Sequence, residues 1–151
     1  MNPTVEQRVE HARDLHRSGY NCCQAVVAAY ADIFGVDENT ALRMSASFGG
    51  GIGGMRQTCG AACGMFMLCG MLCGQTKAGD IAAKKYNYQQ VQLLARRFKD
   101  IHGSVICAEL LGLKQPEDPN ATILKQPCNQ TVANAARIIG EYISDYENKN
   151  S

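Results

Sequence analysis

Four cysteines have both the residue type and the placement that thiol chemistry requires. Cys22, Cys59, Cys107 and Cys128 each lie at, or within one turn of, the predicted start of a helix. A helix start carries about half a positive charge and several unpaired N–H groups, and both favour a thiolate over a thiol. Such sites lower the pKa of a cysteine from about 8.5 into the range of about 3.5–7.5. These four residues are therefore the candidate site.

Two kinds of chemistry suit the four thiols. In dithiol chemistry, a low-pKa thiolate attacks a disulfide and a nearby thiol resolves the mixed disulfide. Cys22 and Cys59 are the first candidate pair, because each lies beside a strong capping residue. In metal binding, the four thiolates hold an iron–sulfur cluster or a zinc ion. The spacings match neither a zinc ribbon nor a ferredoxin, so the sequence leaves both alternatives open.

A third alternative is a structural or interaction protein whose cysteines only fill the core. Residues 58–74 (TCGAACGMFMLCGMLCG) contain no charged residue. This stretch is shorter than the roughly 20 residues of a membrane span, so it predicts a buried central helix. Buried cysteine behaves as a small hydrophobic residue. The cysteines expected to act in this way are Cys63, Cys69 and Cys73.

The same central helix carries two pairs of glycines spaced four residues apart, namely Gly60 with Gly64 and Gly70 with Gly74. Small residues at this spacing allow a second backbone to approach closely. The glycine run at residues 49–54 precedes this helix and is expected to turn tightly between two helices.

The rest of the chain shows helical periodicity and capping signals, and no segment has the pattern of a strand. The expected caps are Thr4, Asn21, Asp37, Thr58, Asp80 and Ser104. The helix that follows Asn21 is expected to run on to Gly35, and the last helix to cover about residues 129–146. Prolines 116, 119 and 127 predict a long irregular loop before it. The expected fold is all-α: a single domain over residues 1–151, with six to seven helices bundled around the Cys-, Met- and Gly-rich central helix.

Composition limits the class of partner. The 151 residues are 46% hydrophobic and 19% charged, with a net charge of +1. This balance is globular and gives no electrostatic reason to expect nucleic acid or a membrane surface. The first residues lack the apolar segment of a secretory signal, so a cytoplasmic location is expected. In a reducing cytosol the eight cysteines remain mostly thiols.

Short motifs over most of the chain resemble those of the C-GCAxxG-C-C family. They are residues 20–26 (YNCCQAV), 48–53 (FGGGIG), 59–64 (CGAACG) and 103–112 (GSVICAELLG), followed by Cys128. The resemblance implies a small redox-active protein of bacteria or archaea with four shared cysteines, which by position are Cys22, Cys59, Cys107 and Cys128. It leaves Cys23, Cys63, Cys69 and Cys73 outside the shared set.

The resemblance also extends to the non-haem part of split-Soret cytochromes, which has been linked to an iron–sulfur centre. This chain has no C-x-x-C-H, so covalently attached haem is not expected. The implied partner is a redox partner protein or a small thiol or disulfide, and a homodimer is left open.

Three residues near the cysteines give weaker signals. His102 precedes Cys107 and is a candidate proton partner, although a histidine near a helix end also simply complements the dipole. Arg56 lies near Cys59 and is expected either to favour its thiolate or to face solvent. His16 is expected to be a core or boundary histidine.

Overall fold

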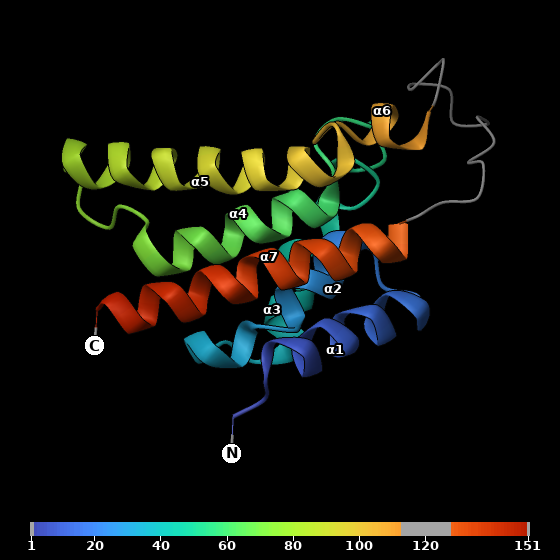
Figure 1. Ribbon diagram of the computed structural model, residues 1–151, viewed down its shortest axis with the longest axis horizontal. Helices are drawn as coiled ribbons and strands as arrows, with labels where there is room; N and C mark the ends of the chain where they lie inside the picture. Colours follow the sequence, from blue (N-terminus) through green and yellow to red (C-terminus); the bar gives the residue numbers. More distant parts are fainter. Residues whose placement is uncertain (1, 113–127, 151) are drawn as a thin grey trace.

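The computed structural model describes residues 2–112 and 128–150, and over these residues the protein is a bundle of α-helices with no strand (Figure 1). The predicted all-α class and the count of six to seven helices are confirmed. The predicted proline-rich loop lies outside the described residues. The elements are α1 (Val5–Arg17), α2 (Cys22–Ala28), the 3-10 helix η1 (Ala31–Phe34), α3 (Glu38–Ser45), the 3-10 helix η2 (Ala46–Phe48), α4 (Gly60–Cys73), α5 (Ile81–His102), α6 (Cys107–Leu111) and α7 (Cys128–Lys149).

Local capping explains where several of these helices begin. Thr4 and Asn21 form complete capping boxes with the glutamines three residues later. The carboxylates of Asp37 and Asp80 accept hydrogen bonds from the third residue of α3 and α5, respectively. These side chains satisfy backbone N–H groups that have no partner inside the helix. Gly103 ends α5 in the left-handed conformation with φ 86°, as glycine readily allows.

The helix after Asn21 is shorter than predicted, because tertiary contacts break it. It ends at Ala28, and a 3-10 helix continues the chain to Phe34. Arg8 of α1 donates a hydrogen bond to the carbonyl of Ala29 at 2.8 Å. The hydroxyl of Tyr30 donates to the carbonyl of Ala136 on α7 at 2.6 Å. These contacts satisfy polar groups at the break and override local helix propensity.

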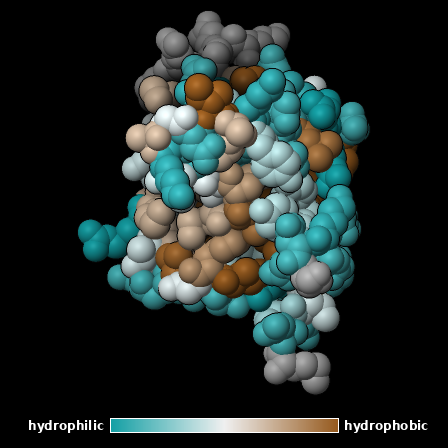
Figure 2. All heavy atoms as spheres, turned by 90° about the vertical axis from the view of Figure 1, so that its left-hand side faces the viewer, coloured by the Kyte–Doolittle hydropathy of each residue, from teal (hydrophilic) through white to brown (hydrophobic). Residues whose placement is uncertain are grey.

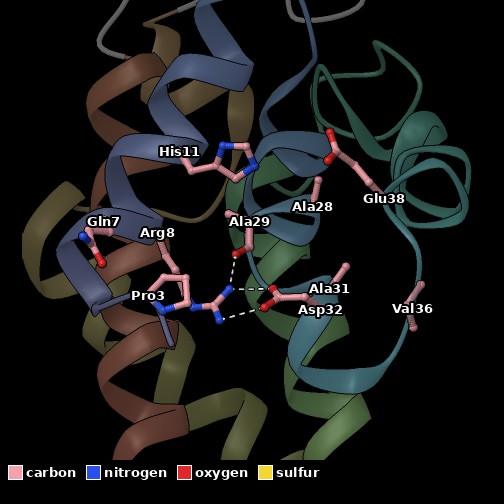
Figure 3. A pocket seen from close by; sticks show the side chains of 10 residues that line it. All are labelled: Pro3, Gln7, Arg8, His11, Ala28, Ala29, Ala31, Asp32, Val36 and Glu38. Atoms are coloured by element: carbon pink, nitrogen blue, oxygen red, sulfur yellow. Dashed lines mark hydrogen bonds and ion pairs between the residues drawn. The ribbon is translucent and has the colours of Figure 1, made fainter. Parts of the chain in front are cut away.

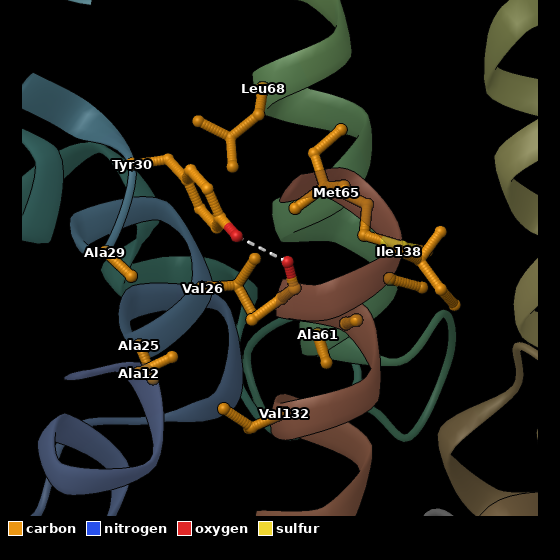
Figure 4. Packing of buried hydrophobic residues seen from close by; sticks show 14 of the residues in the cluster. Ala12, Ala25, Val26, Ala29, Tyr30, Ala61, Met65, Leu68, Val132 and Ile138 are labelled. Carbon is orange, nitrogen blue, oxygen red and sulfur yellow. Dashed lines mark hydrogen bonds between the residues drawn. The ribbon is translucent and has the colours of Figure 1, made fainter. Parts of the chain in front are cut away.

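The core lies around α4, which packs against α2, α5 and α7. Tyr30, Met65 and Leu68 are among its largest fully buried side chains, and Figure 4 shows them converging between these helices. The prediction that α4 is a buried central helix is confirmed for its first three turns. Towards its end, Met71 is 49% exposed.

The first pair of glycines brings α2 and α4 together. A Cβ atom at Gly64 would lie 2.8 Å from the Cβ of Val26, and one at Gly60 would lie 3.2 Å from the backbone nitrogen of Cys23. The second pair does not behave as predicted, because Gly70 has no neighbouring atom within 4 Å of such a Cβ.

The two ends of the bundle differ in character. α4 and α7 both begin at the end of the bundle that also carries α6 (right in Figure 1). The opposite end, which faces the viewer in Figure 2, exposes apolar side chains. No helix in the described part of the chain is long and apolar enough to cross a membrane.

Candidate functional site

The four cysteines expected from the sequence line one cavity of about 280 Å³. They are Cys22, Cys59, Cys107 and Cys128, and they come from the starts of α2, α4, α6 and α7. Cys59 and Cys107 are buried, while Cys22 and Cys128 are half-buried. All eight cysteines of the chain are free thiols. The fold therefore gathers thiols that are up to 106 residues apart, from Cys22 to Cys128, around one space.

The predicted position of Cys59 is wrong by one residue. Thr58 was expected to cap α4, but Cys59 itself is the N-cap and the helix begins at Gly60. Thr58 instead forms an isolated antiparallel β-bridge with Ile106. The other three cysteines are each the first residue of their helix.

This bridge holds Cys59 and Cys107 side by side. The backbone N–H of Cys59 donates to the carbonyl of Val105 at 2.6 Å, and that of Cys107 donates to the carbonyl of Gln57 at 2.6 Å. Two isolated residues pairing across 48 positions leave no alternating pattern in the sequence. Sequence reasoning therefore missed the element that positions half of the cysteines.

The glycine run forms the turn beneath the same cavity. Gly51 has φ 72°, and a Cβ atom there would lie 2.6 Å from the Cα of Arg56 and 2.7 Å from the Cβ of Cys107. Only glycine allows both that conformation and that approach. The prediction of a tight turn is confirmed, and its function is to bring Arg56 against the thiols.

Arg56 does act on a thiol, but not on its sequence neighbour Cys59. Its Nη1 donates to the sulfur of Cys107 at 3.8 Å. Its positive charge also lowers the pKa of Cys128. The backbone of Arg56 is left-handed, with φ 60°.

Cys22 and Cys128 form a hydrogen-bonded pair with opposite pKa shifts. The hydrogen bond from Cys22 lowers the pKa of Cys128 to about 7, against the opposing effect of burial. The same bond, followed by burial and by the charges of the other three site cysteines, raises the pKa of Cys22 far above its ordinary value. At pH 7 Cys22 is therefore a thiol, while Cys128 is divided about equally between thiol and thiolate.

Cys59, the other member of the pair expected from the capping signals, differs from Cys128 in its pKa. Burial raises the pKa of Cys59 to about 11, and the opposing effect of the backbone N–H groups of Ala62 and Ala61 is smaller. Its thiol is therefore protonated at neutral pH. The sequence could not reveal this, because the shift comes from burial beneath other helices.

Two histidines, His16 and His102, also line the cavity, and each contacts an asparagine of α7. Nε2 of His16 lies 3.8 Å from the sulfur of Cys22, and Nδ1 of His16 lies 3.1 Å from Nδ2 of Asn129. Nε2 of His102 lies 3.2 Å from Nδ2 of Asn134. Burial lowers the pKa of both imidazoles, so both are neutral at pH 7. His16 was expected to be a core or boundary histidine, and its contact with Cys22 across the start of α2 was missed.

Metal binding is the alternative use of the same four thiols. Four thiolates are a suitable set of ligands for an iron–sulfur cluster or for zinc. Within residues 2–112 and 128–150, however, no three Cys, His, Asp or Glu side chains are grouped so that they could hold a metal ion.

The remaining cysteines lie outside the cavity. Cys63 and Cys69 are buried, as predicted, and Cys73 is half-buried. The sulfurs of Cys69 and Cys73 lie 3.9 Å apart, and the amide of Asn87 donates to both. The sulfur of Cys23 contacts that of Met67 at 3.7 Å. These thiols pack in the helical core and do not reach the site.

A larger hollow of about 590 Å³ lies beside α1 and η1, and no cysteine lines it (Figure 3). Its central charge, Arg8, is already satisfied: it pairs with both carboxylate oxygens of Asp32, at 2.6 and 2.9 Å, and with a backbone carbonyl. The guanidinium also lies 5.3 Å from the centre of the Tyr30 ring. The charged group of this hollow is therefore part of a structural ion pair, and we do not regard the hollow as a second site.

Comparison with known proteins supports the assignment of the thiol cavity. The sequence model of one family, described as "Putative redox-active protein (C_GCAxxG_C_C)", matches residues 20–142. The match includes all four cysteines of the cavity. No curated protein and no solved structure matches the chain.

Proposed function

Because this chain belongs to the C_GCAxxG_C_C family of redox-active proteins, we propose that it exchanges dithiol for disulfide at Cys22 and Cys128. The observation that supports this proposal is the hydrogen bond between the two thiols at the starts of α2 and α7. A neighbouring thiol and thiolate are the two groups that the exchange requires. The substrate is a small disulfide or a disulfide of a partner protein.

In the first step the thiolate of Cys128 attacks one sulfur of the substrate disulfide. A new bond forms between that sulfur and Cys128, the substrate S–S bond breaks, and the other half leaves as a thiolate that takes up a proton from solvent. The attacking thiol is well matched to this task, because disulfide exchange is fastest for a thiol whose pKa is near the ambient pH. Its pKa is about 7.

In the second step the thiol of Cys22 loses its proton to solvent, and its sulfur attacks the sulfur of Cys128. The mixed disulfide breaks, the second half of the substrate leaves as a thiolate, and a Cys22–Cys128 disulfide remains. Two electrons have then passed from the protein to the substrate. Once Cys128 is in the mixed disulfide, it no longer carries a charge or accepts a hydrogen bond. The two effects of Cys128 that raise the pKa of Cys22 thus disappear at the moment Cys22 must act.

The test is to oxidise the reduced protein with one equivalent of a small disulfide and to map the products by mass spectrometry. We expect a Cys22–Cys128 disulfide in the wild type. In Cys22→Ser we expect a stable mixed disulfide on Cys128, and in Cys128→Ser no rapid reaction.

Cys73→Ser is the matched control, because Cys73 is a half-buried thiol outside the cavity. It should behave like the wild type. The proposal is wrong if Cys128→Ser reacts as fast as the wild type, or if the disulfide forms between other cysteines.

A further inference from the structure

The neighbours of His16 determine which of its ring nitrogens carries the proton. The side-chain amide of Asn129 has two contacts that do not involve the histidine: its Oδ1 accepts from Nε of Arg13 at 2.9 Å, and its Nδ2 donates to the carbonyl of Arg13 at 3.2 Å. Reversing the amide would place nitrogen against nitrogen and oxygen against oxygen. The orientation of Asn129 is therefore fixed by donors and acceptors whose chemistry is not in doubt.

With this orientation, Nδ2 of Asn129 directs its second N–H at Nδ1 of His16, 3.1 Å away. Nδ1 must then be the acceptor, and in a neutral imidazole the proton lies on the other nitrogen, Nε2. Nε2 faces the sulfur of Cys22 at 3.8 Å. His16 is neutral at pH 7, because burial lowers its pKa.

We infer that His16 is a catalytic residue of the dithiol exchange, acting as a hydrogen-bond donor to the sulfur of Cys22, and that Asn129 is the positioning residue that fixes its tautomer. This inference rests on the proposed function. An imidazole with its proton on Nε2 has no lone pair to offer Cys22, so it does not remove the thiol proton. It stabilises the negative charge that develops on this sulfur when Cys22 attacks the mixed disulfide.

The inference separates the two steps of the reaction. The first step takes place at Cys128, whose pKa depends on Cys22, burial and Arg56. The second step needs a negative charge on Cys22, the sulfur that His16 contacts. Loss of the imidazole N–H should therefore slow the second step, while the first step still proceeds.

The experiment uses one equivalent of an aromatic disulfide whose released thiolate is coloured. The first equivalent of colour reports attack by Cys128, and the second reports resolution by Cys22. In His16→Leu we expect the second release to slow by roughly 10- to 100-fold, the effect of losing a hydrogen bond to a charged group. His16→Gln places an amide N–H near the position of Nε2 and should restore much of the second rate, whereas His16→Asn, which is one carbon shorter, should not.

A second measurement does not depend on activity. Nitrogen NMR of ¹⁵N-histidine-labelled protein should show the proton of His16 on Nε2 in the wild type, and a mixture of tautomers in Asn129→Ala. Equal second-step rates in His16→Leu and wild type, or a wild-type proton on Nδ1, would overturn the inference. A wild-type protein that releases only one equivalent would instead refute the proposed dithiol exchange, and the NMR result would still decide the tautomer.

Discussion

Replacing Cys22 by alanine tests the origin of the reactive thiolate. The hydrogen bond from Cys22 is the largest influence that lowers the pKa of Cys128 from its ordinary value of 9.0 to about 7. In Cys22→Ala only burial, which raises this pKa, and the smaller effect of Arg56, which lowers it, remain. The pKa of Cys128 should therefore return to about 9 or above.

The size of the effect on rate follows from two opposing factors. At pH 7 the thiolate fraction of Cys128 falls from about one half to about one hundredth, a loss of about 50-fold. A thiolate of higher pKa is intrinsically more nucleophilic, and with a Brønsted coefficient of about 0.45 the gain over two pKa units is about eightfold. Cys22→Ala should thus attack a small disulfide about sixfold more slowly than the wild type at pH 7. At pH 10, where Cys128 is mostly thiolate in both proteins, the variant should be about sevenfold faster.

The assay follows the first release of thiolate from a small disulfide between pH 5 and pH 10, and mass spectrometry assigns the adduct to Cys128. The two rate profiles should cross near pH 8. Cys73→Ala, which removes a thiol outside the cavity, should leave the profile unchanged. If the rate profile of Cys22→Ala still gives Cys128 a pKa near 7, the hydrogen bond from Cys22 is not what activates Cys128, and the reasoning fails.

Three further predictions concern the scaffold and are read from denaturant unfolding. Gly64→Ala should lower the free energy of unfolding by about 1–3 kcal/mol, because its Cβ would lie 2.8 Å from a valine of α2. Gly70→Ala, with open space around it, should raise the free energy of unfolding by about 0.5–1 kcal/mol. The reverse order would contradict the packing of α4 against α2. Tyr30→Phe removes a buried hydrogen bond to a backbone carbonyl of α7 and should cost about 0.5–1.5 kcal/mol, so an unchanged midpoint would count against that bond. Pairing with Arg8 lowers the pKa of Asp32 below 3.8 in the folded state, so the stabilisation that the ion pair gives is complete above that pH and is lost as the pH falls further. Asp32→Asn should therefore weaken the pH dependence of stability below about pH 4. An identical pH dependence in this variant and the wild type would refute the linkage.

Much of the fold was readable from local chemistry. The capping side chains of Thr4, Asn21, Asp37 and Asp80 marked helix starts that the structure confirms, because an N-cap acts on backbone groups two or three residues away. The uncharged stretch at residues 58–74 identified the central helix for a similar reason: its composition excludes it from the surface. The four cysteines were likewise selected by their positions near helix starts.

The sequence could not show which of these thiols are hydrogen-bonded to each other, or which of them carry a proton at neutral pH. Cys22 and Cys59 had the same local signals, yet the hydrogen-bonded partner of Cys22 is Cys128, brought there by α7. The β-bridge that positions Cys59 and Cys107, and the amide of Asn129 that orients His16, involve partners 48 and 113 residues apart. Local sequence determines backbone conformation over a few residues, whereas a pKa depends on every charge, donor and buried surface around the group, and only the packing of the helices brings those together.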